Sequence, residues 1–553
     1  MNELQTLKRR PLLVMSTFCA LLTVLISLFA ANSVLARGSA AGPVYGGTLH
    51  IAYTGGMGTL DPAHSYNDDW WLINGTLFNG LYQFDRNGQP QLDLAAAPPT
   101  ISSDHLTWTF HIRKGVRFSN GMPVTAEDLR YSITRSLDPH LKPGPSWGQA
   151  ADEIFQGSVE FANGKARSVS GIQVLDPYTI RFKLIKPVAA LPFILAETFN
   201  MVVPEPVVSK ESEEYFASHP IGTGPYKLVY WHKGVGLEFV RNPYYYHHGK
   251  PYIDKILVDV PVDSSLITLR ILKGELDGFG NDQDISAADM QQLRHTPADA
   301  KYLVNAPVTV VTWLDLSPRD APMNNAMLRQ AVAMAIDRTR LVKLLGGLGA
   351  PAGGMYIPLM PQHDAALDQN PVYPYNPTKA AALVKASGYK GQQIVLYYSN
   401  STPDNVSSVP GVLQALQQIG LNVVLRGLTS TSLLALSGNM TGHPISMQEW
   451  SIDYPDAYDI YTGVMSCAAN SLGGTSAAKY CDQTADNLVT QAEGLSLGPD
   501  RNSLLQQAER RILKTATKVP LYYLKDYEIV SPRVGGFYYM PTFGWQFENY
   551  WLK

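Results

Sequence analysis

Residues 376–425, NPTKAAALVKASGYKGQQIVLYYSNSTPDNVSSVPGVLQALQQIGLNVVL, alternate between helix and strand patterns. Asn376 and Pro377 suit the N-cap and the first turn of a helix. The pattern predicts a helix ended by Gly388, a strand at 393–398, a helix at 412–419 stopped by Gly420, and a strand at 421–425. A strand, a helix and a strand at this spacing predict two parallel strands joined by a crossover helix. The fold class is therefore α/β.

A second ordered pattern lies upstream, in residues 106–137. Trp108, Phe110 and Ile112 alternate with polar residues, which predicts a half-buried strand. Thr125 then stands three residues before Asp128, a pair that caps the first turn of a helix. This segment predicts a strand, a turn and a capped helix in order.

The N-terminal segment is typical of an exported protein. Lys8, Arg9 and Arg10 precede an apolar run, residues 12–31, that contains no charge. Small residues near Ala36 suit cleavage after that position, so residues 1–36 are predicted to be a signal peptide. The run is also long enough to span a bilayer, so an uncleaved N-terminal anchor is the alternative.

The rest of the chain excludes several functional classes. Its 553 residues exceed one hydrophobic core, so two or three domains are expected. The net charge of −3, with both signs interspersed, argues against a nucleic-acid partner. The common sequence motifs of hydrolases, nucleotide-binding enzymes and metal sites are missing, so no catalytic residue, cofactor or metal is predicted. Gly222–Tyr226 is interpreted as a turn entering a strand, and His247–His248 as a surface turn.

Two cysteines, Cys467 and Cys481, lie beyond the export segment. In an oxidising compartment their even number and short separation favour an intramolecular disulfide over two free thiols. Such a bridge would have a structural role.

The segment from Trp450 to Asp456 is the most suggestive chemically, because Asp453 stands between Trp450 and Tyr454. In a cleft, a carboxylate flanked by aromatic rings suits an ammonium ligand. The alternative is a Pro-containing turn with Trp450 in an ordinary core. The residues alone leave both interpretations open.

Several segments together resemble one known family, the peptide and nickel solute-binding proteins of ABC importers, bacterial extracellular solute-binding protein family 5. The most specific match is residues 106–135, LTWTFHIRKGVRFSNGMPVTAEDLRYSITR. Supporting matches in the same order are Thr59–Pro62, Leu77–Leu81, Gly222–Tyr226, Arg241–Tyr244, Leu328–Ala331 and Ile336–Arg338. The resemblance covers nearly the whole chain after residue 36.

The resemblance implies an α/β, two-lobed periplasmic-binding-protein-like fold of the class II type, with hinge strands and an additional inserted domain. Lobe I would comprise residues 44–80, 200–305 and 519–553, the inserted domain residues 81–199, and lobe II residues 306–518. The chain would cross the hinge near Asn305 and return near Lys518.

The resemblance also implies a ligand site. Peptide-binding members carry an aspartate in a Trp-x-x-Asp setting that pairs with the ligand's α-ammonium group, and Asp453 matches it. Extended backbone at Tyr66–Asp68 would pair with the peptide main chain. The predicted ligand contacts are Trp450, Asp453, Tyr454, Tyr66, Asn67 and Asp68. Met447 departs from oligopeptide receptors that place a basic residue there, which leaves the length of the peptide open.

The function implied is non-enzymatic: an extracytoplasmic receptor, expected to be a monomer, captures peptides and delivers them to an ABC transporter permease in the membrane. Alternatives are another solute, such as a nickel chelate or a sugar, a surface sensor, and a secreted hydrolase using Asp453 and Asp456.

Overall fold

The structure is a computed structural model that describes residues 42–56, 58–64, 68–142, 148, 153–280 and 285–553. The chain divides into two units, residues 1–44 and 45–553, and all the described helices and strands lie in the second. The predicted export segment, residues 1–36, lies outside the described residues. Within the described ranges, no helix combines the length and the apolar character needed to cross a membrane.

A five-stranded sheet carries the N-terminal strand. Its order is β11 (Gly278–Phe279), β1 (Thr48–Ala52), β10 (Lys255–Asp259), β9 (Gly236–Arg241) and β8 (Tyr226–His232). Strand β1 is parallel to both neighbours, whereas β8, β9 and β10 are antiparallel. Helices α2 (Asp68–Leu77), α9 (Ser264–Leu272) and α10 (Ala287–His295) belong to the same part of the chain. The predicted turn at Gly222–Tyr226 does lead into a strand, β8.

A four-stranded antiparallel sheet lies within residues 81–199. Its order is β4 (Thr100–Ile101), β5 (Thr107–His111), β7 (Thr179–Lys183) and β6 (Ile172–Asp176). Helix α3 (Ala126–Ser136) begins with the predicted capping box, formed by Thr125 and Asp128. Trp108 and Phe110 are buried on β5, as their alternation predicted. The same region contains the β2–β3 hairpin (Tyr82–Phe84, Pro90–Leu92) and the short helices α5 (Ser158–Ala162) and α6 (Leu191–Ile194).

A six-stranded sheet forms the core of the C-terminal half. Its order is β13 (Gly349–Pro351), β17 (Lys518–Ile529), β12 (Leu303–Leu316), β16 (Ile445–Ser451), β14 (Ile394–Ser399) and β15 (Val423–Leu428). Around it lie α11 (Ala326–Ala335), α12 (Arg338–Leu344), α14 (Pro377–Ala386), α15 (Pro403–Gln418), α16 (Ser430–Ser437), α18 (Gln483–Glu493) and α19 (Pro499–Lys514).

The predicted crossover is confirmed, because β14 and β15 pair in parallel on either side of α15. Asn376 caps α14 as expected, and its side chain accepts a hydrogen bond from the Lys379 amide. Helix α15 is longer than predicted and begins at Pro403, which occupies the first turn, where its missing N–H is not needed. The apolar pattern did not indicate this start, because the first turns of the helix are polar and Pro410 lies inside it.

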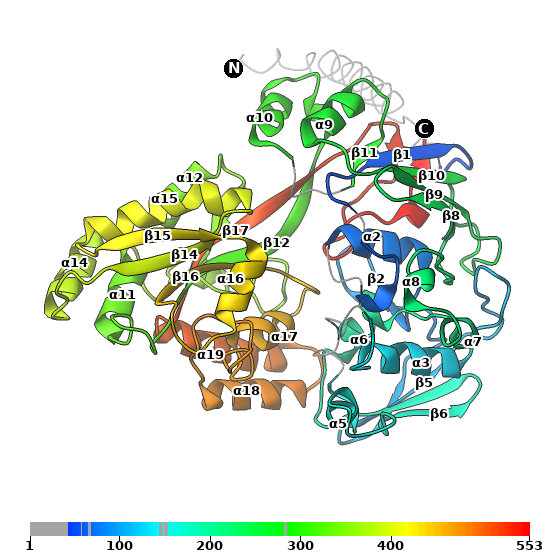
Figure 1. Ribbon diagram of the computed structural model, residues 1–553, viewed down its shortest axis with the longest axis horizontal. Helices are drawn as coiled ribbons and strands as arrows, with labels where there is room; N and C mark the ends of the chain where they lie inside the picture. Colours follow the sequence, from blue (N-terminus) through cyan, green and yellow to red (C-terminus); the bar gives the residue numbers. More distant parts are fainter. Residues whose placement is uncertain (1–41, 57, 65–67, 143–147, 149–152, 281–284) are drawn as a thin grey trace, which may run out of the picture. The chain divides into compact units, whose positions relative to one another are not determined.

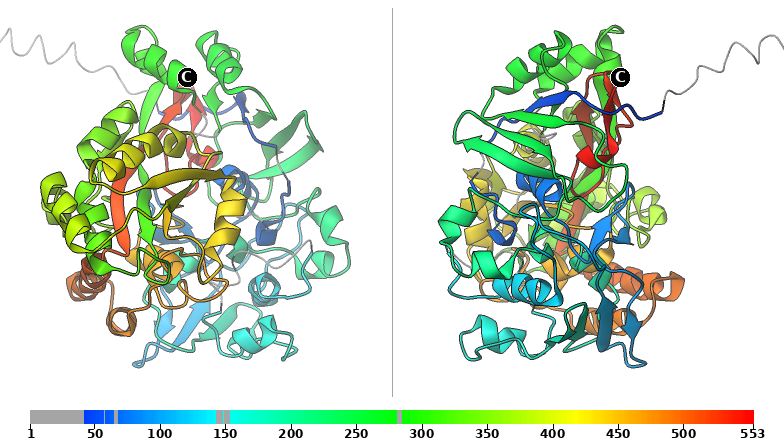
Figure 2. Two further views of the ribbon diagram at one scale, coloured as in Figure 1. Left: turned by 60° about the vertical axis from the view of Figure 1, so that its left-hand side comes forward. Right: turned by 90° about the vertical axis from the view of Figure 1, so that its right-hand side faces the viewer.

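Two long antiparallel strands, β12 and β17, connect the sheets (Figure 1). Their register runs from Leu303 opposite Ile529 to Asp315 opposite Lys518. Just after β17, Val530 bridges to Gly278 of β11 in the five-stranded sheet. The two strands run side by side in the further views as well (Figure 2).

The register bears on the hinge, since Asn305 lies opposite Tyr527. If β12 crosses between the lobes at Asn305, the neighbouring strand β17 crosses back at the residue opposite, Tyr527. We therefore propose that the chain returns through the hinge near Tyr527 rather than near Lys518. Lys518 instead pairs with buried Asp315 at the far end of the strands, with Nζ 2.6 Å from Oδ1.

Candidate functional site

The Trp450–Asp456 segment begins at the end of an inner strand and continues into a helix. Strand β16 ends at Ser451, and Asp456 caps helix α17 (Ala457–Ile460), accepting a hydrogen bond from the Tyr458 amide at 2.9 Å. A π-helical turn, Tyr461–Met465, follows directly. The predicted Pro-containing turn is therefore present, and it carries Asp453 between two rigid elements.

Asp453 is held in place by Asp459, six residues further on. Asp459 Oδ2 accepts hydrogen bonds from the Asp453 amide at 3.0 Å and from Trp450 Nε1 at 3.2 Å. Trp450 is half-buried, and its ring covers Gly463, where a β-carbon would come within 2.8 Å of the indole. Asp459 thus orients both the tryptophan and the aspartate that the sequence singled out.

Asp456 has a different role. Arg501 donates to both of its carboxylate oxygens at 2.7 Å, and Arg501 also pairs with Glu493 at 2.7 Å. All three side chains are buried, and Gln362 Nε2 adds a further hydrogen bond to Asp456 at 2.9 Å. A carboxylate engaged in this way is part of the core and is not available as an acid or a base.

The segment contacts the region of residues 81–199 from across the molecule. Tyr454 stacks on Phe193 of α6, with ring centroids 5.5 Å apart and an interplanar angle of 28°. The Ala190 amide donates to Glu493 Oε2 at 3.1 Å. Figure 1 shows α6 facing the α17 end of the C-terminal half. Residues far apart in sequence thus meet around Asp453.

Burial and mutual repulsion raise the pKa values of the carboxyl groups here. Glu197, only 1% exposed, has its pKa raised well above the usual value by burial and by the charges of Asp453 and Asp459. The pKa of Asp459 is also raised well above its usual value, by burial and by the charge of Asp453. A group of acids that resist ionisation together favours a positively charged ligand.

The structure describes only some of the other predicted ligand contacts. Tyr66 and Asn67 lie outside the described residues. Asp68 is the first residue of helix α2, whereas extended backbone was expected there. Met447 is fully buried on β16 opposite Leu314, so it packs in the core of the sheet.

The predicted disulfide is present, and it closes the chain just after this site. Cys467 and Cys481 are bonded with their Cα atoms 4.4 Å apart. The Cys467 amide donates to Asp486 at 3.3 Å, and the Tyr461 hydroxyl donates to the same carboxylate at 2.7 Å. The bridge and α18 therefore anchor the π-helical turn on which Trp450 packs.

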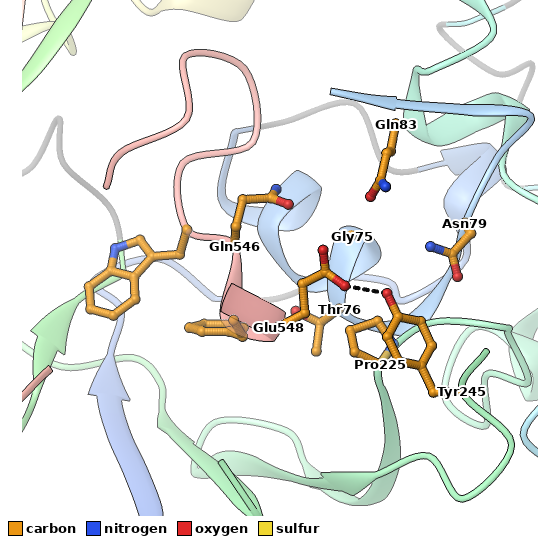
Figure 3. Close-up of a pocket in the computed structure, with 10 residues that line it drawn as sticks. Gly75, Thr76, Asn79, Gln83, Pro225, Tyr245, Gln546 and Glu548 are labelled. Atoms are coloured by element: carbon orange, nitrogen blue, oxygen red, sulfur yellow. Dashed lines mark hydrogen bonds between the residues drawn. The ribbon is translucent and has the colours of Figure 1, made fainter. Parts of the chain in front are cut away.

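A separate small pocket lies in the other part of the protein (Figure 3). It is lined by Gly75, Thr76, Asn79, Gln83, Pro225, Tyr245, Trp545, Gln546, Phe547 and Glu548. The Tyr245 hydroxyl donates to Glu548, which also pairs with His247 at 3.4 Å. His247 is thus in the predicted turn, but it is half-buried between two acids. None of the predicted ligand contacts that the structure describes lines this pocket.

Sequence reasoning did not find Glu197, Asp459 or Phe193. Glu197 and Phe193 lie in a stretch without a motif, more than 250 residues before Asp453. Only the folded chain brings them to the site. Asp459 had a weak signal, since it follows Asp453 and Asp456 at the start of a short helix.

Residues 89–471 match the family described as bacterial extracellular solute-binding proteins, family 5 Middle. The periplasmic oligopeptide-binding protein OppA of Escherichia coli K12 is 27% identical, over 93% of this chain and 94% of its own.

Two solved structures share the fold. The clavulanic acid biosynthesis oligopeptide binding protein 2 superposes with a TM-score of 0.83 at 20% identity, covering 92% of this chain and 96% of its own. AgaA of A. tumefaciens R10, solved in complex with agropinic acid, superposes with a TM-score of 0.75 at 22% identity, covering 92% and 99%. At these identities the similarity concerns the fold: a mixed α/β, two-lobed binding-protein architecture with an inserted domain.

Proposed function

We propose that this chain, which belongs to the family 5 bacterial extracellular solute-binding proteins, captures peptides outside the cytoplasm and delivers them to an ABC permease. Members of the family are solute receptors for ABC import and are not enzymes. Beyond family membership we propose three points. The solute is a peptide, the protein acts outside the cytoplasm, and an ABC permease receives the peptide.

The observation that carries the peptide assignment is the setting of Asp453. Asp453 is half-buried, Asp459 holds its amide, and the next residue, Tyr454, stacks on Phe193 of the inserted domain. An α-ammonium group would gain a charge-assisted hydrogen bond from Asp453. The neighbouring rings would exclude water and attract the cation.

Lobe closure fits the same role. The Tyr454–Phe193 stack and the Ala190–Glu493 hydrogen bond join the inserted domain to lobe II. Ligands that touch both lobes stabilise this closed arrangement by their differential contacts with it. Backbone pairing and bridging water would hold a peptide without selecting one sequence.

The assignment to the cell exterior rests on the export segment at residues 1–36 and on the periplasmic relative. The Cys467–Cys481 disulfide supports the same location, because disulfides persist in oxidising compartments.

Native mass spectrometry of the purified protein tests the ligand class. We expect a mass excess that denaturation releases as short peptides. Recovery of a sugar, an opine or a metal chelate with no peptide would contradict the peptide assignment while leaving the receptor role intact.

A further inference from the structure

Glu197 is a buried acid that the amine-binding role of Asp453 does not explain. It lies three residues after α6, on the inserted-domain side of the site. Among the residues that the structure describes, neither of its carboxylate oxygens has a hydrogen-bond partner. A buried carboxyl group without partners is costly whether it is ionised or protonated, because each form needs donors or acceptors.

The acids of the site oppose one another's ionisation. Burial and the charge of Asp453 raise the pKa of Asp459 well above its usual value. A cationic group of a ligand would offset this repulsion. Glu197 is then a further acid, and the groups that act on it are the carboxyls of Asp453 and Asp459.

The neighbours of Glu197 point to where a second cation would sit. Phe193, four residues earlier, stacks on Tyr454, the residue after Asp453. Glu197 therefore lies beside the contact between residues 81–199 and the Asp453 segment, where the charges of Asp453 and Asp459 act on it. A ligand group close to the α-ammonium, namely the side chain of the first peptide residue, would be within reach of Glu197.

We propose that Glu197 is a specificity residue that selects peptides whose first residue has a cationic side chain. The proposal rests on the peptide function above and names the ligand subclass of that site. Asp453 holds the α-ammonium from lobe II, and Glu197 accepts hydrogen bonds from the side-chain cation from the inserted domain. A cation beside Glu197 would favour ionisation of a carboxyl group whose charge burial and the neighbouring acids otherwise oppose.

The test compares two peptide series, Lys-(Ala)n and norleucine-(Ala)n with one to four alanines, by isothermal titration calorimetry at pH 7. Norleucine keeps the length of lysine and lacks its ammonium group. We expect the wild-type protein to bind the best lysine peptide at least about tenfold more tightly than its norleucine partner. Glu197→Gln should abolish that preference.

Exposed Glu211, changed to Gln, serves as the matched control and should retain the preference. Equal binding of both series by the wild-type protein would overturn the specificity proposal alone, as would a preference that survives Glu197→Gln. Failure of the wild-type protein to bind either series would overturn the peptide function itself. The wild-type comparison needs no variant, so it decides the question even if Glu197→Gln does not fold.

Discussion

His247 provides a pH-dependent test of the folded structure. Its ring nitrogens pair with Asp93 Oδ1 at 3.2 Å and with Glu548 Oε2 at 3.4 Å. Burial alone would lower the pKa of His247, but its hydrogen bonds and ion pairs with the two acids raise the pKa from 6.5 to about 9. Burial likewise opposes ionisation of Glu548, yet His247, Lys250 and Tyr245 lower the pKa of Glu548 to about 2.

The direction of the pH dependence follows from the number of protons that the folded and unfolded states bind. Between pH 6.5 and pH 9 the folded protein keeps the His247 proton, whereas the unfolded chain loses it. The stabilisation is therefore complete below pH 6.5 and disappears as the pH rises through 9. One pH unit corresponds to about 1.4 kcal/mol, so the His247 contribution to the free energy of unfolding falls by about 3 kcal/mol over this range.

Urea unfolding of the wild-type protein and of His247→Gln, followed by tryptophan fluorescence from pH 6 to pH 9.5, measures this contribution. The wild-type protein should be more stable at pH 6 by about 3 kcal/mol, and the difference should vanish near pH 9.5. His248→Gln, a change at the exposed neighbour, should behave like the wild-type protein. A pH dependence that is the same in His247→Gln and in the wild-type protein would refute the reasoning.

Further changes test the packing of the fold. Arg135→Met removes the partner of buried Asp61, whose Oδ1 lies 2.7 Å from the arginine, and should cost about 3 to 5 kcal/mol of unfolding free energy; unchanged thermal stability would contradict a paired buried acid. Reduction of the Cys467–Cys481 disulfide should lower the unfolding free energy by about 3 kcal/mol, measured by urea unfolding with and without reductant. Gly224→Ala places a β-carbon 2.5 Å from backbone and should cost about 2 kcal/mol or more in the same assay, whereas a neutral effect would show that this turn can move.

The sequence predicted the fold where patterns are local. The parallel pair β14–β15 and the capping box of α3 follow from spacing within a few turns of chain. The start of α15 was missed because its first turns are polar and Pro410 interrupts the pattern. Propensity and periodicity are weak guides wherever tertiary packing stabilises a polar segment.

Many of the motif residues that carry the family resemblance prove to hold the fold together. Asp61, from the first short motif, pairs with Arg135 at the end of the most specific one. Thr223, in the glycine-rich turn, donates to Asn79 of another motif at 3.0 Å. The resemblance therefore predicted the architecture well, because the matching residues contact each other across it.

The site was predicted only in part. Asp453 and Asp456 are the same residue type three positions apart, yet Asp456 is paired with Arg501, 45 residues further on, and Asp453 is the one that we propose for the ligand. No local pattern separates these roles. Glu197 likewise comes under the influence of Asp453 and Asp459 only because residues 81–199 fold against the Trp450–Asp456 segment.

The central claim is that Asp453 anchors the amino terminus of a peptide. The most direct test is the affinity, by calorimetry, of wild-type protein and Asp453→Asn for a peptide identified by mass spectrometry and for its N-acetylated copy. We predict that acetylation and Asp453→Asn each weaken binding at least about tenfold, and that together they weaken it little further, because both remove the same contact. Unchanged affinity of folded Asp453→Asn for the free peptide would contradict the claim.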